Sequence, residues 1–185
     1  MARGSFPPGE LLSRLNSPGG RWHQTGRCAG EMNSLKGTDE EAWFLINALL
    51  QDAVKLGLDP LDNREHPDSE PHGSYRCPVG RDIYRGIPQP PDALTWLGEI
   101  DVDGTTTVRG RDVHWRYYFM EPRIDPATED DVLLGCSVRA KGIGAEYRPV
   151  EQTRQMRDAI EAGKRWCRHQ KPAYAWRPSL WDSRQ

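Results

Sequence analysis

The sequence predicts an α+β fold: a small antiparallel sheet with an N-terminal helix and a C-terminal helix packed on it. Two observations lead to this prediction. Apolar residues recur at helical spacing in residues 42–54 and again in residues 150–167. Between them, apolar and polar residues alternate in residues 113–119 and 132–141, as they do in half-buried strands. Strands that are grouped between helices, and do not alternate with them, are typical of the α+β class.

The chain of 185 residues is long enough for one domain with additional segments. Residues 1–37 are rich in proline and glycine and lack periodicity, so we expect a loosely ordered N-terminal arm. The single domain is expected over residues 38–171. Within it, residues 59–92 are dense in proline, acidic residues and histidine, which predicts a long loop, and residues 172–185 form a C-terminal tail.

The first helix is marked at both of its ends. Thr38 is a suitable helix cap, and Glu41, three residues later, can return a hydrogen bond to it. The apolar residues between 42 and 54 form a wide stripe that is typical of a core helix. Gly57, followed by Pro60, predicts the end of this helix.

The strands follow after two prolines. Residues 93–102 and 105–108 are predicted to pair across a tight turn at Asp103–Gly104, because Asp-Gly is a frequent hairpin turn. The strand over residues 113–119 and the strand over residues 132–141 each have an apolar face and a polar face. We therefore expect one face of the sheet to meet the core and the other to carry polar and basic side chains.

The polar faces of these two strands are candidates for an anion site. If the strands are antiparallel neighbours, their basic residues lie on one side of the sheet: His114, Arg116, Arg139 and Lys141. A functional interpretation is a phosphate-bearing partner, for which the planar guanidinium is well suited. The alternative is that acidic residues such as Glu99 or Glu146 pair with these cations.

The C-terminal helix adds a second basic surface. It is predicted to begin near Pro149, which suits a first helical turn. Its outer face is expected to carry five cations, Arg154, Arg157, Lys164, Arg165 and Arg168. The formal net charge of the chain is -2, yet residues 105–185 carry 15 Lys and Arg against 11 Asp and Glu. This half is the better candidate for binding an anion such as a nucleic acid.

The order of a capped helix, a hairpin sheet, the strand His-Trp-Arg-Tyr-Tyr-Phe at residues 114–119, the strand over residues 133–141 and a closing helix resembles the RelE/ParE/HigB-type toxins of bacterial toxin–antitoxin systems. The resemblance covers residues 38–168. It implies an endoribonuclease that cuts mRNA on the ribosome and is held inactive by a small antitoxin protein, without a metal or other cofactor.

The resemblance also implies roles for individual residues. Arg116 would match the arginine that steadies the scissile phosphate, and Arg139 or Lys141 the residue that stabilises the developing negative charge. Tyr147 would match a tyrosine that acts in proton transfer. From its own chemistry, His114 is a further candidate base, since imidazole titrates near neutral pH and RNA cleavage requires removal of the 2′-hydroxyl proton.

Two other function classes remain open on the sequence. The same basic sheet would serve a non-catalytic nucleic-acid-binding or regulatory module. Alternatively, the chain is a structural or accessory protein of a phage or mobile element, in which the long loop and the tail make protein contacts. Trp176 and Trp181 in the tail fit stacking on single-stranded bases or, as the more ordinary role, a cover for apolar surface.

Metal chemistry and secretion are not favoured. His66, His72 and Cys77 are residue types that bind zinc, but they lack the spacing of a zinc site. Residues 129–131 are consecutive acidic residues, as in a solvated loop. No stretch approaches the roughly 20 apolar residues of a membrane span, and the first residues lack the apolar segment of a signal peptide. The four cysteines form no Cys-x-x-Cys pair, so we expect a cytoplasmic protein with reduced thiols.

Overall fold

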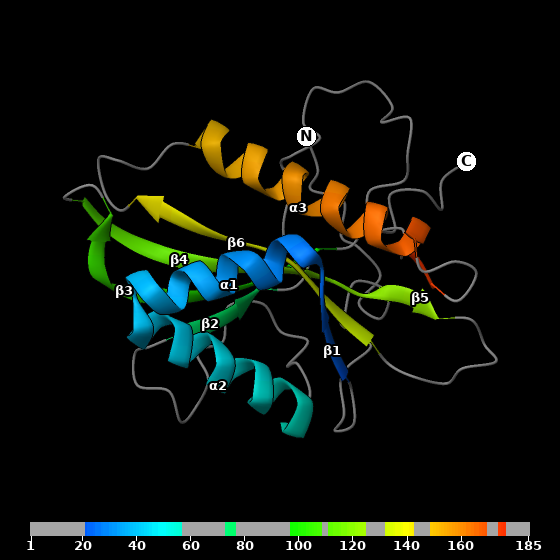
Figure 1. Ribbon diagram of the computed structural model, residues 1–185, viewed down its shortest axis with the longest axis horizontal. Coiled ribbons are helices and arrows are strands. Elements are labelled where there is room, and N and C mark those ends of the chain that lie inside the picture. Colours follow the sequence, from blue (N-terminus) through cyan, green and yellow to red (C-terminus); the bar gives the residue numbers. More distant parts are fainter. Residues whose placement is uncertain are drawn as a thin grey trace, which may run out of the picture.

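The computed structural model shows an α+β fold, as predicted, with helices on both faces of a five-stranded sheet (Figure 1). The structure describes residues 21–56, 73–76, 97–108, 111–124, 132–142, 149–169 and 174–176. The elements, in chain order, are β1 (Arg21–Gln24), α1 (Gly26–Thr38), α2 (Glu40–Leu56), β2 (Gly73–Arg76), β3 (Gly98–Val108), β4 (Arg111–Met120), β5 (Pro122–Ile124), β6 (Val132–Gly142), α3 (Pro149–His169) and β7 (Tyr174–Trp176).

The main sheet has the strand order β1-β6-β4-β3-β2. The pairs β2–β3, β3–β4 and β4–β6 are antiparallel, and β1 adds a parallel strand at the edge beside β6. The antiparallel pairing of β4 with β6 is as the sequence predicts, whereas β1 and β2 were not expected. The turn predicted at Asp103–Gly104 is wrong. Strand β3 continues to Val108, and only its register against β4 shifts between Asp103 and Thr107. Strands β5 and β7 form a separate antiparallel pair.

Residues 21–37, which we expected to belong to a loosely ordered arm, instead form β1 and α1. Thr25 caps α1, because its Oγ1 accepts a hydrogen bond from the backbone N–H of Cys28 at 3.1 Å. Cys28, Met32 and Leu35 are the buried residues of α1, and their spacing places them on one face. The sequence signal was weak because small and polar residues separate these three positions.

Helix α2 forms as predicted, but Asp39 caps it and Thr38 does not. Asp39 Oδ1 accepts a hydrogen bond from the N–H of Ala42 at 3.1 Å. The other oxygen of this buried carboxylate, Oδ2, accepts one from the indole nitrogen of Trp115 at 2.9 Å. Thr38 is the last residue of α1, where its hydroxyl bonds back to the carbonyl of Ser34. Asp39 therefore fixes α2 to strand β4 as well as starting the helix.

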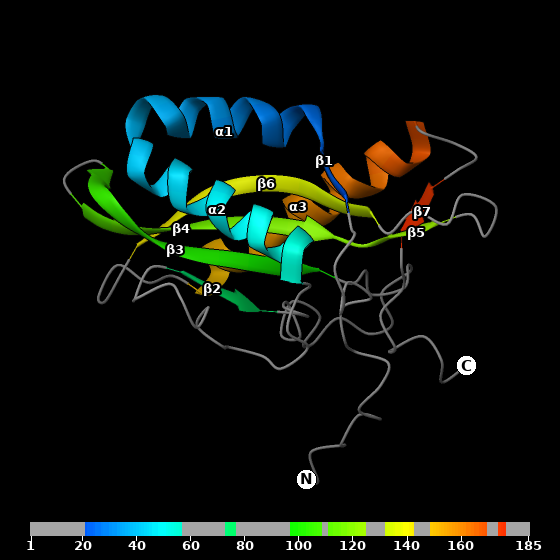
Figure 2. The same cartoon turned by 90° about the horizontal axis from the view of Figure 1, so that it is seen from below.

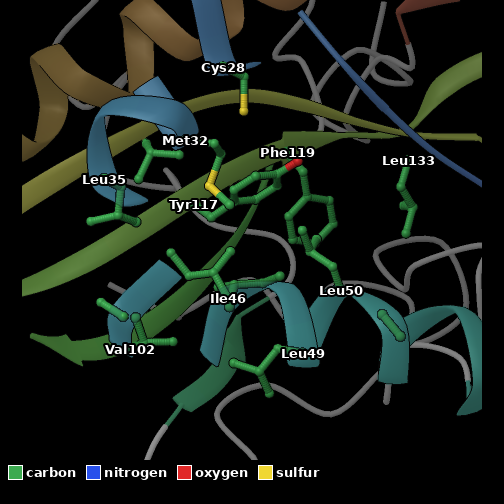
Figure 3. Close-up of a cluster of buried hydrophobic side chains, with 14 residues drawn as sticks. Cys28, Met32, Leu35, Ile46, Leu49, Leu50, Val102, Tyr117, Phe119 and Leu133 are labelled. Atoms are coloured by element: carbon green, nitrogen blue, oxygen red, sulfur yellow. The ribbon is translucent and has the colours of Figure 1, made fainter. Parts of the chain in front are cut away.

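Two apolar cores lie on opposite faces of the sheet. The first packs α1 and α2 on the sheet, with Tyr117 and Phe119 of β4 at its centre (Figure 3). The second lies under α3 and includes Tyr118 and Met120, the residues that alternate with these two along β4. Figure 2 shows α1 and α2 on one side of the sheet and α3 on the other. The prediction that this strand is buried on one face only is therefore wrong, because β4 is a central strand.

The remaining predicted segments are described only in part. Strand β2 lies inside the long loop expected at residues 59–92, and β7 lies inside the tail expected at residues 172–185. Tyr147, the histidines and cysteine weighed as metal ligands, the acidic run at residues 129–131 and Trp181 lie outside the described residues. No helix that the structure describes is long and apolar enough to cross a membrane.

Candidate active site

Strand register brings the predicted basic residues together on the face that α3 partly covers. His114 lies opposite Lys141, and Arg116 lies opposite Arg139, in the antiparallel pair of β4 and β6. Directly opposed residues of antiparallel strands point to the same face of a sheet. The placement of these four residues on one side of the sheet is therefore as predicted.

Arg116, however, is not part of an exposed cationic surface. It is 2% exposed, and its Nη1 donates to both carboxylate oxygens of Glu99, at 2.6 and 2.7 Å. Its Nη2 donates to Asp101 Oδ2 at 2.9 Å. The sequence left open whether these cations meet a phosphate-bearing partner or an acidic residue of the chain. For Arg116, the structure shows pairing with the acidic residue Glu99. The interaction extends to Asp101, which the sequence analysis did not name.

The two carboxylates keep the buried guanidinium charged. Desolvation disfavours the charged form of Arg116, but the negative charges of Glu99 and Asp101 outweigh it and raise the pKa of Arg116 above its ordinary value. The cluster thus places one guanidinium against two carboxylate groups. Such a buried group is held by its geometry and adds little net stability compared with apolar packing.

His114 connects this buried cluster to the surface. Its Nδ1 lies 3.4 Å from Asp101 Oδ1, and the exposed fractions of the two side chains are 32% and 10%. This separation is an ion-pair distance, and Oδ1 accepts no aligned hydrogen bond. His114, Asp101, Arg116 and Glu99 thus form a chain of polar groups that runs from the rim of the sheet into its interior. Lys141, directly across the strand pair from His114, is half-buried.

Further polar groups surround Arg116 on the same face. Tyr118 lies between Glu99 and Ser137 in register, and burial raises the pKa of its phenol well above the usual range. Gln155 of α3 donates from Nε2 to the carbonyl of Ala140 at 3.1 Å. Among the described residues, five buried side-chain atoms have no hydrogen-bond partner: Asp101 Oδ1, Arg116 Nε, Tyr118 Oη, Ser137 Oγ and Gln155 Oε1. Such atoms are rare in folded proteins, and their concentration marks this region as a candidate site.

Arg139 shares the face but is engaged elsewhere. Its Nη1 lies 2.6 Å from Glu31 Oε1 on α1. The other oxygen of Glu31 accepts the backbone N–H of Val138 at 2.7 Å, beyond the point where β1 stops pairing with β6. Glu31 therefore holds both the open edge of β6 and the guanidinium of Arg139. Of the predicted pair Arg139 and Lys141, only Lys141 lies in register with His114.

The predicted basic surface of α3 is present in part. Four arginines are exposed on its outer side, Arg154, Arg157, Arg165 and Arg168. Lys164, which we also expected there, is 5% exposed and lies on the buried side. From Arg154 to Arg168 the helix rises about 21 Å. This stripe is separate from the buried cluster around Arg116.

The sequence did contain a signal for the acidic half of the site. Glu99, Asp101 and Asp103 alternate with Ile100 and Val102 in the strand that precedes the basic one. An acidic face on one strand and a basic face on the next predict pairing when the two are neighbours. The misplaced hairpin turn concealed this signal, because it paired residues 93–102 with residues 105–108 and not with the basic strand that follows.

The fold and the site define a class of protein in structural terms: an α+β protein with a charged, partly unsatisfied polar cluster between its sheet and its C-terminal helix. No protein-family model matches the chain, and comparisons with curated proteins and with solved structures give no significant match.

Proposed function

We propose that this chain is a toxin-like protein that cleaves RNA without a metal ion, with His114 as the general base. The observation that carries the proposal is the position of His114. Its Nδ1 lies 3.4 Å from Asp101, whose other oxygen Arg116 holds, while a third of the imidazole side chain remains exposed. A carboxylate that orients one imidazole nitrogen leaves the other nitrogen to accept a proton.

The chemistry requires few groups. Nε2 of His114 accepts the proton of an RNA 2′-hydroxyl, and the 2′-oxygen attacks the adjacent phosphorus. The bond from phosphorus to the 5′-oxygen breaks, giving a 2′,3′-cyclic phosphate and a 5′-hydroxyl, whose proton comes from water. The ammonium group of Lys141, across the strand pair, stabilises the negative charge on the phosphorane oxygens. The distance from His114 to Asp101 shortens when substrate binds, as catalytic hydrogen bonds often do.

Arg116 has a different role in this proposal from the one that the toxin resemblance implies. A guanidinium that is 2% exposed and bound to two carboxylates does not reach a scissile phosphate. Arg116 is instead a positioning residue, which fixes Asp101 and through it the imidazole. The exposed arginines of α3 bind phosphates of the RNA strand away from the reacting nucleotide.

One rival function is supported by its own observation. The stripe Arg154, Arg157, Arg165 and Arg168 on α3 suits a protein that binds RNA and does not cut it. In that case RNA affinity depends on these arginines and falls steeply with salt, because each phosphate contact releases counterions. His114 would then be dispensable.

Cleavage of a labelled RNA by the purified protein, in the presence of a chelator, separates these possibilities. We expect cleavage by the unmodified chain, a loss of about 10²–10⁴-fold for His114→Asn and a smaller loss for Lys141→Ala. Lys55→Ala is the control, since Lys55 is an exposed cation of α2, on the other face of the sheet. Expression in a bacterial host should arrest growth, and His114→Asn should relieve the arrest.

Three outcomes contradict the proposal. Unchanged cleavage by His114→Asn would remove the histidine from the mechanism. Salt-dependent RNA binding without cleavage would favour the rival function. The absence of both RNA binding and RNA cleavage would exclude action on RNA altogether.

A further inference from the structure

A cavity of about 310 Å³ lies between the first turn of α1 and the C-terminal half of α3. Its lining includes Arg27, Asp158, Glu161, Arg165, Trp166 and His169. The volume is at the lower end of the range of small-molecule sites, roughly 300–1,000 Å³. From Gln155, beside the candidate active site, to Trp166, α3 rises about 16 Å, so the cavity is a separate site on the same helix.

The aromatic part of the lining is held in place. Trp166 is half-buried, and its ring lies 5.9 Å from the ring of His23 of β1, with an angle of 47° between the planes. This contact joins α3 to the edge strand and restricts the rotation of the indole. A large, oriented aromatic ring on the wall of an open cavity is suited to stacking against a flat ligand.

The charged groups of the cavity fall into two sets. Arg27 is committed: its Nε lies 2.9 Å from Glu31 Oε1, and its Nη2 lies 3.5 Å from Asp158 Oδ2. Glu161 and Arg165 are exposed, lie one turn apart on α3, and make no hydrogen bond or ion pair with another described residue. Besides the Arg27–Asp158 pair and the imidazole of His169, the cavity lining thus contains the carboxylate of Glu161, the guanidinium of Arg165 and the indole of Trp166.

We propose that this cavity binds the guanine base of a nucleotide. Guanine presents two adjacent N–H donors, N1–H and N2–H, which match the two oxygens of the Glu161 carboxylate, while the ring stacks on Trp166. Arg165 binds the attached phosphate. Uracil places its single N–H between two carbonyl oxygens that repel a carboxylate, and adenine and cytosine lack an adjacent pair of donors.

The source of the guanine is either an RNA strand or a free nucleotide, and the assignment to RNA rests on the proposed function. In an RNA strand, guanine in this cavity would direct the active site to a bond a few nucleotides away, since the two sites lie about 16 Å apart along α3. The binding of guanine itself does not depend on cleavage.

Calorimetric titration of the full chain with GMP, AMP, CMP and UMP tests the site. We expect GMP to bind about tenfold or more tightly than the other three, as one bidentate base contact allows. Glu161→Gln should remove this preference and Arg165→Ala should weaken all four nucleotides. Glu161 is exposed, so this variant should fold normally. Glu151→Gln, an exposed carboxylate in the first turn of α3, is the matched control and should bind GMP unchanged.

Equal affinity for all four nucleotides, no detectable binding, or an unchanged GMP preference in Glu161→Gln would overturn the proposal. A second titration with a short guanine-containing RNA and its adenine-substituted form separates the two sources: tighter binding of the RNA than of GMP supports a strand, and weaker binding supports a free nucleotide. GMP binding without RNA cleavage would contradict only the proposed function. RNA cleavage together with equal binding of the four nucleotides would contradict only the proposed guanine site, and not the proposed function.

Discussion

Nη1 of Arg116 on β4 lies 2.6 Å from Oε1 of Glu99 on β3, and the two side chains are 3% and 1% exposed. An ion pair so fully removed from water is costly to form and costly to break, because each charge depends on the other to replace its hydration. Asp101 contacts the same guanidinium through Oδ2, and its Oδ1 lies next to Nδ1 of His114. The buried pair thus connects the core of the sheet to the candidate base.

Arg116→Ala should lower the free energy of unfolding by about 3–5 kcal/mol, since it leaves Glu99 and Asp101 buried without a counter-charge. Urea denaturation followed by circular dichroism measures this change. Arg154→Ala, which truncates an exposed arginine of α3, is the control and should change stability by about 0.5 kcal/mol or less. Equal effects of the two substitutions would show that the pair with Glu99 is not formed in solution.

Asp101→Asn should separate the positioning role from binding. The amide keeps the shape of the carboxylate but no longer favours a donated Nδ1–H, so His114 is held less firmly in the tautomer that accepts a proton at Nε2. We expect kcat for RNA cleavage to fall while KM stays within about twofold, as for an interaction made only in the transition state. A rise in KM with unchanged kcat would place Asp101 in substrate binding instead.

Gly135→Ala should destabilise the protein, whereas Gly30→Ala should stabilise it. A Cβ at residue 135 would collide with the phenol of Tyr117, which is fully buried, so we expect a loss of about 1–3 kcal/mol. Gly30 lies inside α1 with no neighbour near its Cβ position, so alanine should add about 0.5–1 kcal/mol through its helix propensity. Thermal unfolding of both variants checks the packing of β6 and α1; a neutral Gly135→Ala would contradict it.

Alkaline pH should weaken the fold in a way that depends on Cys28. Burial raises the pKa of this thiol from 9.0 to about 12, a change that Tyr117 opposes by hydrogen bonding and Glu31 reinforces. The folded state therefore holds the proton more tightly than the unfolded state. This contribution to stability is complete below pH 9 and is lost as pH rises from 9 toward 12.

Unfolding free energies measured between pH 8 and pH 11 should decline less steeply in Cys28→Ala than in the unmodified chain. The slope with pH is the readout, because the substitution also removes buried volume and lowers stability at every pH. Parallel slopes for the two proteins would contradict the burial of this thiol.

The sequence predicted the parts of the fold that depend on local pattern. Helix α2, strands β4 and β6 and helix α3 have clear apolar periodicity, and their packing around one sheet follows from it. Helix α1 was missed because its buried positions, Cys28, Met32 and Leu35, are few and its other residues are small or polar.

The candidate site, too, was predicted only as far as local sequence pattern determines it. Alternation along β4 and β6 places His114, Arg116, Arg139 and Lys141 on one face, and this follows from sequence alone. Which of them is buried does not, because it depends on the packing of α3 and on the alignment of the acidic face of β3 with β4. A carboxylate and a guanidinium become partners only when strand register aligns them, and the register here depended on a turn that was misplaced.

The chemical identity of the cleaved ends tests the central claim most directly. We propose attack by the 2′-oxygen with His114 as base, so the purified chain, in the presence of a chelator, should convert RNA to fragments with a 2′,3′-cyclic phosphate and a 5′-hydroxyl. It should leave a strand with a 2′-deoxy sugar at the cleavage position intact. Fragments with a 5′-phosphate, cleavage of the 2′-deoxy strand, or loss of all cleavage on chelation would contradict the account.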